Sequence, residues 1–188
     1  MERKVEKVIK DIKALKIQGA RNIAKAVVNA IILQIQKSRA KTLDELYSEL
    51  LVVSEALASA RPTEPMVRNA VGEIARFAFT QIKTNEVKDA KELQKKGIAK
   101  EKDYLKKMDE NSRALIEYGA KLIPDGAVVM THCHSSTVTG ILKRAADMGN
   151  QIKVFACETR PRYQGRITAK ELVDADIETS LIVDSAMN

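Results

Sequence analysis

Both cysteines and both histidines of the chain fall within residues 126–166. Cys133 stands between His132 and His134, after a short apolar run at 127–130 that predicts a buried strand. The hydroxyl side chains that follow predict a loop that leads into a helix. A thiol in such a loop faces backbone amides that favour the thiolate, so Cys133 is a candidate base or nucleophile. The alternative is a buried small apolar residue, the usual state of a free cysteine.

The same three residues are metal-ligand types, but their spacing does not favour a metal site. Neighbouring side chains on an extended segment point to opposite sides, so His132 and His134 are expected on one side and Cys133 on the other. A tetrahedral site needs three or four ligands, and the only other such cluster is Cys157 with Glu158. We therefore predict neither a metal nor another cofactor.

Two loops carry residues that suit an anion. Ser135 and Ser136 are predicted at a helix N-terminus, where free amides and the helix dipole attract phosphate, although simple helix capping explains them equally well. Arg160, Arg162 and Arg166 lie close together in the second loop and suit phosphate or carboxylate, with a solvated loop as the alternative. We take Arg160 as a candidate substrate-binding residue. No glycine-rich nucleotide motif accompanies these residues.

Two further apolar runs, at 152–156 and 181–184, predict a second and a third strand. The segments between the strands predict helices, the second of them over 167–174. Parallel strands joined in this way place their polar loops at one edge of the sheet, where open α/β sheets bind ligands. The last loop, which ends at Asn188, is expected at that edge as well.

The first half of the chain predicts helices only. Apolar residues at helical spacing predict one helix over 1–17, a second after Gly19, a third opened by a capping box at Thr42 and Glu45, and a fourth from about Met66. The fold class predicted from both halves is α/β, with an all-helical N-terminal domain followed by a partial Rossmann-like parallel sheet with flanking helices.

The junction between the two halves is strongly charged. Residues 84–107 predict an exposed helix that is broken near Gly97. A buried stripe that includes Leu115 and Leu122 is predicted to continue beyond it.

A Pro-Asp-Gly turn at 124–126 then marks the predicted domain boundary. It separates a helical domain at 1–125 from an incomplete Rossmann-like domain at 126–188.

The net charge of +7 is unevenly distributed. Residues 1–41 hold eleven lysines and arginines against three acids, whereas residues 127–188 are neutral. A solvated lysine face is the preferred interpretation, and a nucleic-acid surface or a funnel for anionic substrates are the alternatives. No aromatic residue precedes Tyr47, and no apolar run approaches the ~18 residues of a membrane span. Two cysteines without a disulfide framework favour a cytoplasmic location.

Four motifs together resemble one family. They are THCHS at 131–135, ETRP at 158–161, YQGR at 163–166 and VDSA at 183–186. The sequence resembles the family of the translation initiation factor 2B alpha, beta and delta subunits, methylthioribose-1-phosphate isomerase and archaeal ribose-1,5-bisphosphate isomerase. The corner at Gly19 and the turn at Arg61 are also similar, so the resemblance covers essentially the whole chain.

The cysteine brings the sequence nearest to the ribose-1,5-bisphosphate isomerases. The resemblance implies conversion of ribose 1,5-bisphosphate to ribulose 1,5-bisphosphate, with Cys133 moving the proton between C1 and C2. It also implies that the substrate is held by residues of both halves, namely Gly19, Ala20, Arg61, Ser135 and Ser136. A homo-oligomer is implied as well. The alternative is a non-catalytic regulatory subunit, resembling initiation factor 2B alpha, that contacts initiation factor 2.

Two departures from the family pattern bear on activity. The isomerases favour an arginine before the Gly-Ala pair, where this chain has Gln18, with Arg21 three residues on. The chain also ends at Asn188, before the segment in which the family carries a partner aspartate and an asparagine-lysine pair. We therefore expect the 188-residue chain to be inactive on its own unless another chain supplies those residues.

Overall fold

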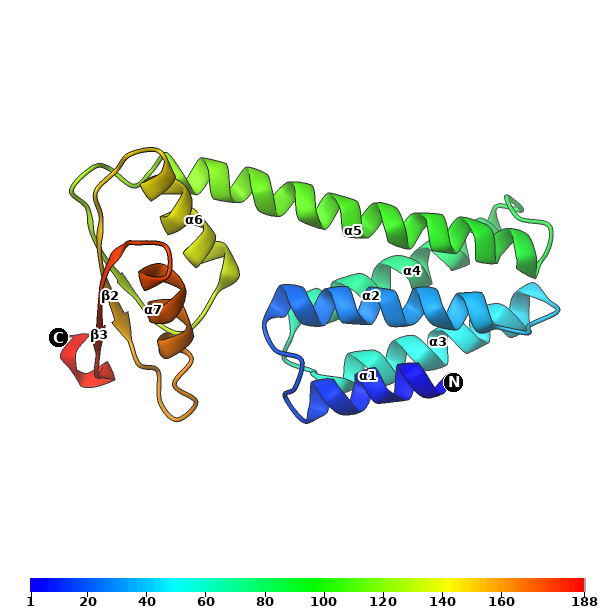
Figure 1. Cartoon of the computed structure of the whole chain (residues 1–188). Coiled ribbons are helices and arrows are strands. Elements are labelled where there is room, and N and C mark those ends of the chain that lie inside the picture. Colours follow the sequence, from blue (N-terminus) through cyan, green and yellow to red (C-terminus); the bar gives the residue numbers. More distant parts are fainter. Residues whose placement is uncertain (188) are drawn as a thin grey trace. The chain divides into compact units, whose positions relative to one another are not determined.

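The computed structural model describes residues 1–187, so Asn188, the end of the predicted last loop, lies outside the described residues (Figure 1). Five helices come first: α1 (Arg3–Lys13), α2 (Ala20–Lys37), α3 (Leu43–Ala60), α4 (Pro65–Lys83) and α5 (Ala90–Ala120). Strands and helices then alternate: β1 (Val128–Thr131), α6 (Ser136–Asp147), β2 (Lys153–Cys157), α7 (Gly165–Val173), β3 (Glu178–Ile182) and a 3-10 helix, η1 (Asp184–Met187). This order confirms the predicted α/β fold class.

Backbone contacts divide the chain into two compact units, Met1–Met108 and Asp109–Asn188. They are called unit 1 and unit 2 below, and each is described by itself. Helix α5 begins in unit 1 and ends in unit 2. The predicted domain boundary at 125/126 stays a prediction.

Unit 1 is held together by the apolar faces of its helices. Val5 and Ile12 of α1 are fully buried, as the amphipathic spacing predicts. Helix α3 begins with a complete capping box, in which the Thr42 hydroxyl accepts from the Glu45 amide and the Glu45 carboxylate accepts from the Thr42 amide. The core of unit 1 is a layer of mostly aliphatic side chains between its helices.

Helix α5 differs from its prediction at two places. It runs unbroken through the buried Gly97, where an added Cβ would lie 3.4 Å from Ile35 and 3.6 Å from Ile74, in ordinary van der Waals contact. The predicted stripe is also wrong at Leu115 and Leu122, which are 53% and 64% exposed.

Within unit 2 the end of α5 packs through other positions. Gly119 of α5 faces Ile141 of α6, and Ile116 of α5 faces Gly140 of α6. A glycine opposite an isoleucine on each helix allows the two backbones to approach closely.

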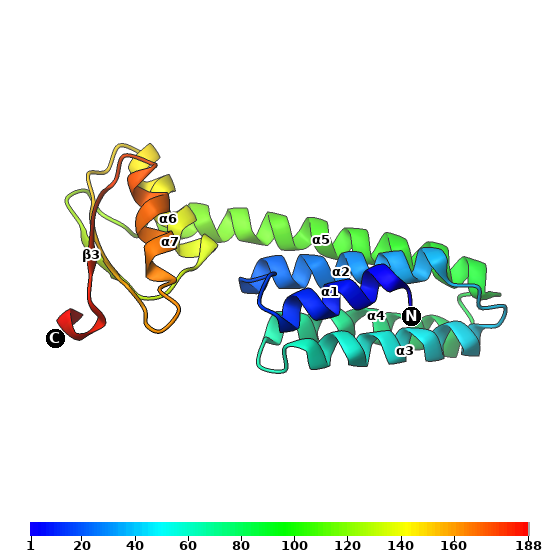
Figure 2. The same ribbon diagram turned by 60° about the horizontal axis from the view of Figure 1, so that its bottom comes forward.

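Unit 2 is a three-stranded parallel sheet in the order β1-β2-β3. In its register Val128 lies opposite Lys153, and Lys153 lies opposite Glu178. Both crossovers step in the same direction, so right-handed connections place α6 and α7 on the same face of the sheet (Figures 1 and 2). Leu142 of α6, Leu172 of α7 and Val154 of β2 form the core beneath them.

The other face of the sheet is open within unit 2. Val128 and Met130 on β1 are 66% and 50% exposed. Next to them the Lys153 ammonium lies 5.6 Å from the centre of the Phe155 ring. Among residues 1–187, no helix is both long enough and apolar enough to cross a membrane.

Candidate active site

The loop after β1 holds Cys133 in an unusual backbone conformation. Its φ of 69° lies in the left-handed region, which a non-glycine residue occupies only when its surroundings fix it. The Cys133 amide donates to the Thr159 hydroxyl at 2.8 Å. The Cys133 thiol donates to Gln164 Oε1 at 3.2 Å. Backbone and side chain of Cys133 are thus both fixed by the loop after β2.

That second loop is fixed in turn by the residue at the end of β3. Asp184 accepts from the Thr159 amide and from the Arg160 amide, one to each carboxylate oxygen and both at 2.8 Å. The Thr159 hydroxyl, which accepts from Cys133, donates to the Cys157 carbonyl at 3.1 Å. A chain of bonds therefore links the ends of all three strands at one edge of the sheet.

Asp184 was not singled out as a site residue from the sequence. The signal that pointed to it was its position after an apolar run at the predicted ligand edge. The two amides, that of Arg160 first and that of Thr159 next, lower the pKa of Asp184 from its ordinary value, with the charges of His132 and Arg160 adding to the effect. Asp184 is therefore a carboxylate at neutral pH.

The two histidines have different surroundings. His134 Nδ1 lies 3.1 Å from the Thr168 hydroxyl, which donates its own hydrogen to the Cys133 carbonyl at 3.0 Å. The hydroxyl must then accept from His134, which places the proton on Nδ1. Nε2 of the same ring is 3.8 Å from the Glu171 carboxylate. His132 is exposed and its charge acts on Asp184.

The left-handed turn at Cys133 breaks the extended geometry on which the predicted placement of the histidines rested. Within the part of the chain that the structure describes, no three histidine, cysteine or acidic side chains are grouped as a metal site would require.

The candidate anion-binding residues lie on both sides of Cys133. The Ser135 hydroxyl caps α6 by accepting from the Val138 amide at 3.4 Å, and Ser136 is exposed in the first turn. Arg160 donates from Nε to the buried Glu158 carboxylate at 2.6 Å, and Arg166 approaches that carboxylate at 3.7 Å.

Both of these guanidinium groups also lie over the Tyr163 ring, at 5.6 and 4.2 Å from its centre. The loop thus presents arginines that are held in place by a carboxylate and a ring. This arrangement fixes their direction but neutralises part of their charge.

Three predicted residues belong to unit 1. Gly19, at φ 81°, is the N-cap residue of α2, and Ala20 begins that helix. Arg61 is the C-cap residue of α3. The loop between α1 and α2 and the loop between α3 and α4 lie at the same end of unit 1 in both views (Figures 1 and 2). Their role in substrate binding stays a prediction, as do the roles of Ser135, Ser136 and Arg160.

Asp184→Asn is expected to loosen the loop after β2. An asparagine offers one acceptor oxygen, so one of the Thr159 and Arg160 amides loses its bond and the support of the Cys133 amide weakens. Hydrogen exchange at Thr159, Arg160 and Cys133 should accelerate at least about tenfold.

Asp147→Asn, an equal change at an exposed residue of α6, is the matched control and should leave these amides unchanged. Because the pKa of Asp184 is lowered, the wild-type loop should keep its protection above the ordinary value of 3.8 and lose it only as the pH falls through the lowered value. Equal exchange in wild type and Asp184→Asn would show that Asp184 does not order the loop.

Comparison with known proteins places the chain in a family. Residues 16–188 match the Initiation factor 2 subunit family. The chain belongs to this family. It is 40% identical to the ribose 1,5-bisphosphate isomerase of Pyrococcus furiosus, over 98% of this chain and 56% of that protein. It is 36% identical to a putative methylthioribose-1-phosphate isomerase of Archaeoglobus fulgidus, over 97% of this chain and 55% of that protein.

Solved structures of the family share the fold. The translation initiation factor eIF-2B of Pyrococcus horikoshii matches with a TM-score of 0.81 and 26% identity, over all of this chain and 62% of that one. The 5-methylthioribose 1-phosphate isomerase of the same organism matches with a TM-score of 0.81 at 23% identity, over 97% and 52%. The chain spans about half the length of the curated relatives it matches.

Proposed function

We propose that this protein is an aldose–ketose isomerase for a phosphorylated pentose, and that Cys133 moves the proton. The observation that carries the proposal is the position of Cys133 at the carboxyl edge of the sheet, shortly before the N-terminus of α6, with its amide bonded to Thr159 and its thiol bonded to Gln164. Several relatives that match nearly the whole chain at 30–40% identity are ribose 1,5-bisphosphate isomerases. We therefore take ribose 1,5-bisphosphate as the substrate.

The isomerisation removes one proton from carbon C2 and adds one proton to carbon C1. The C2 proton is removed by Cys133 as thiolate, the C1–O4 ring bond breaks and O4 gains a proton. C1 then takes a proton while the C2 hydroxyl loses its own and becomes the ketone of ribulose 1,5-bisphosphate. No external oxidant or reductant is needed. Ser135 and Ser136 at the start of α6 and Arg160 in the loop after β2 offer hydrogen-bond donors to a phosphate.

Replacing Cys133 by serine tests this assignment, in an assay that also supplies the partner aspartate and the asparagine-lysine pair of the family, because the 188-residue chain is expected to be inactive without them. The hydroxyl is a far weaker base than the thiolate, so turnover of ribose 1,5-bisphosphate to ribulose 1,5-bisphosphate should fall at least about a hundredfold. Cys157→Ser changes the buried cysteine of β2 in the same way and should retain activity in the fraction that folds.

Substrate protection supplies a readout besides turnover. Ribose 1,5-bisphosphate should slow the alkylation of Cys133 by iodoacetamide, whereas unphosphorylated ribose should not. Equal turnover by wild type and Cys133→Ser would remove Cys133 from the mechanism. Absence of both turnover and protection in the wild type, in the same assay with the partner aspartate and the asparagine-lysine pair supplied, would rule out the isomerase function.

A second candidate function is a regulatory subunit that contacts initiation factor 2. The observation in its favour is the 26% identical eIF-2B structure, which matches the whole chain. Binding to initiation factor 2 subunits, together with a lack of substrate protection at Cys133, would favour this function over the isomerase. We propose a homo-oligomer and a cytoplasmic location under either function.

A further inference from the structure

The exposed face of α1 carries a row of three cations, with the exposed Glu6 beside it, three residues after Arg3 and four before Lys10. Arg3, Lys7 and Lys10 follow one another at spacings of four and three residues, opposite the fully buried Val5 and Ile12. All three are exposed. The row extends about 10 Å along the helix axis. One strand of a nucleic-acid duplex places about three phosphates along that length.

These charges are not used inside the protein. Arg3, Lys4, Lys7, Lys10, Lys13 and Lys37 form no ion pair with any residue in 1–187. Elsewhere in unit 1 exposed lysines are often paired with acids, as Lys107 is with Asp103. The six cations are called the basic surface below.

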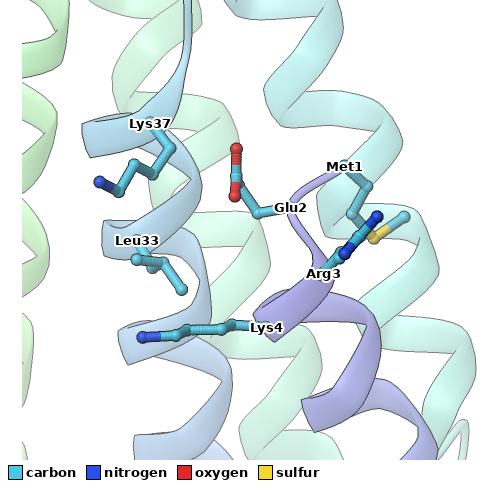
Figure 3. Close-up of a pocket in the computed structure, with 6 residues that line it drawn as sticks. All are labelled: Met1, Glu2, Arg3, Lys4, Leu33 and Lys37. Carbon is cyan, nitrogen blue, oxygen red and sulfur yellow. The ribbon is translucent and has the colours of Figure 1, made fainter.

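A pocket of about 550 Å³ adjoins this surface where α1 begins and α2 ends. Arg3, Lys4 and Lys37 line it together with Leu33, and Glu2 is its one acidic residue. Lys4 and Lys37 extend past Leu33 toward the same side (Figure 3). The buried Gln34 fixes this start of α1, because its Oε1 accepts from the Glu2 amide at 2.9 Å.

The composition of the surface favours one class of polyanion. Protein interfaces have an apolar core with aromatic anchors. On α1 and α2 no large apolar side chain is exposed, and Met1, which lines the pocket and is 50% exposed, does not by itself make such a core. No aromatic residue precedes Tyr47, so unpaired bases would find no ring to stack on. Phosphates of a duplex need neither feature, since lysine and arginine bind them by charge alone.

We infer that the basic surface binds the phosphate backbone of a nucleic-acid duplex without reading its sequence. The pocket between Lys4 and Lys37 receives one phosphate, and the row on α1 follows the strand from there. This interaction uses none of the residues that are proposed for the isomerase.

The experiment measures binding of the full chain to a fluorescent RNA duplex of about 20 base pairs over a range of salt concentrations. The test variant is Arg3→Gln, Lys7→Gln, Lys10→Gln. The matched control is Lys91→Gln, Lys95→Gln, Lys102→Gln, which removes the same charge from exposed positions of α5 in the same unit. Glutamine is about as good a helix former as lysine, and circular dichroism checks that both variants fold.

Wild type should bind with a micromolar Kd at about 50 mM salt, and its affinity should fall steeply as salt rises. The test variant should bind at least about tenfold more weakly, with a salt slope shallower by about three. The control should stay within about twofold of wild type. Equal weakening in both variants, or no duplex binding at low salt, would overturn the inference. Binding of polyglutamate in preference to the duplex would assign the surface to an acidic protein instead.

Discussion

Gly165→Ala should lower the unfolding free energy of unit 2 more than a glycine-to-alanine change at any other position of that unit. A Cβ at Gly165 would lie 1.6 Å from the Cys157 carbonyl oxygen and 2.7 Å from its carbon. Both are backbone atoms of β2, so no side chain can rotate away to make room. Gly165 also begins α7 and donates from its amide to the Glu158 carbonyl at 3.3 Å. We expect a loss of about 4 kcal/mol or more in the unfolding free energy of unit 2.

The labelling rate of the fully buried Cys157 thiol measures this loss, in a Cys133→Ser background where Cys157 is the only cysteine. Gly149→Ala is the control in the same unit. Its φ of 96° disfavours alanine, but no atom lies within 4 Å of the added carbon, so it should cost only about 1 kcal/mol. If Gly165→Ala labels no faster than Gly149→Ala, the close approach of α7 to β2 does not limit the packing.

Glu101→Gln should remove most of the pH dependence of the unfolding free energy of unit 1. The Glu101 side chain is fully buried in α5, and neither carboxylate oxygen has a hydrogen-bond partner. The nearest cation, Lys100, is instead 2.7 Å from the Glu73 carboxylate. Burial first, and the charge of Glu73 next, raise the pKa of Glu101 to about 8. Burial first, and the charge of Glu101 next, raise the pKa of Tyr104.

The sign of this pH dependence follows from the pH at which the folded and the unfolded chain each release the Glu101 proton. The unfolded chain releases it near 4.5 and the folded chain near 8, so the contribution to stability is complete below pH 4.5 and is lost as the pH rises to about 8. The loss is on the order of 4 kcal/mol. Urea unfolding of wild type between pH 5 and 8 should show it, whereas Glu101→Gln should be nearly flat.

Glu55→Gln, an exposed change in α3, should keep the wild-type slope. Both histidines lie in unit 2, so no imidazole of unit 1 titrates in this range. Parallel slopes for wild type and Glu101→Gln would mean that the buried carboxylate stays ionised or finds water.

The sequence predicted what depends on local rules. The capping box at Thr42 set the start of α3, and the valine-rich run before Cys133 set β1, because caps and buried strands are encoded by neighbouring residues. Gly97 and Leu115 were misjudged, since what packs against a helix is decided by distant segments. The role of Asp184 was not predicted from the sequence for the same reason. Its role depends on amides at 159 and 160, which only the folded sheet brings to it.

The register of the sheet gives unit 2 the form of a module used twice. Val128 pairs with Lys153, and Lys153 pairs with Glu178. The strand, loops and helix between the first pair of positions therefore span together as many residues as those between the second pair. Thr159 and Asp184, 25 residues apart, are therefore equivalent positions in successive modules. The hydrogen bond from the Thr159 amide to the Asp184 carboxylate joins these two equivalent positions. An insertion or deletion of one residue in either module would shift one strand end against the next. The length between strands therefore has to be kept for Cys133 to keep its supports.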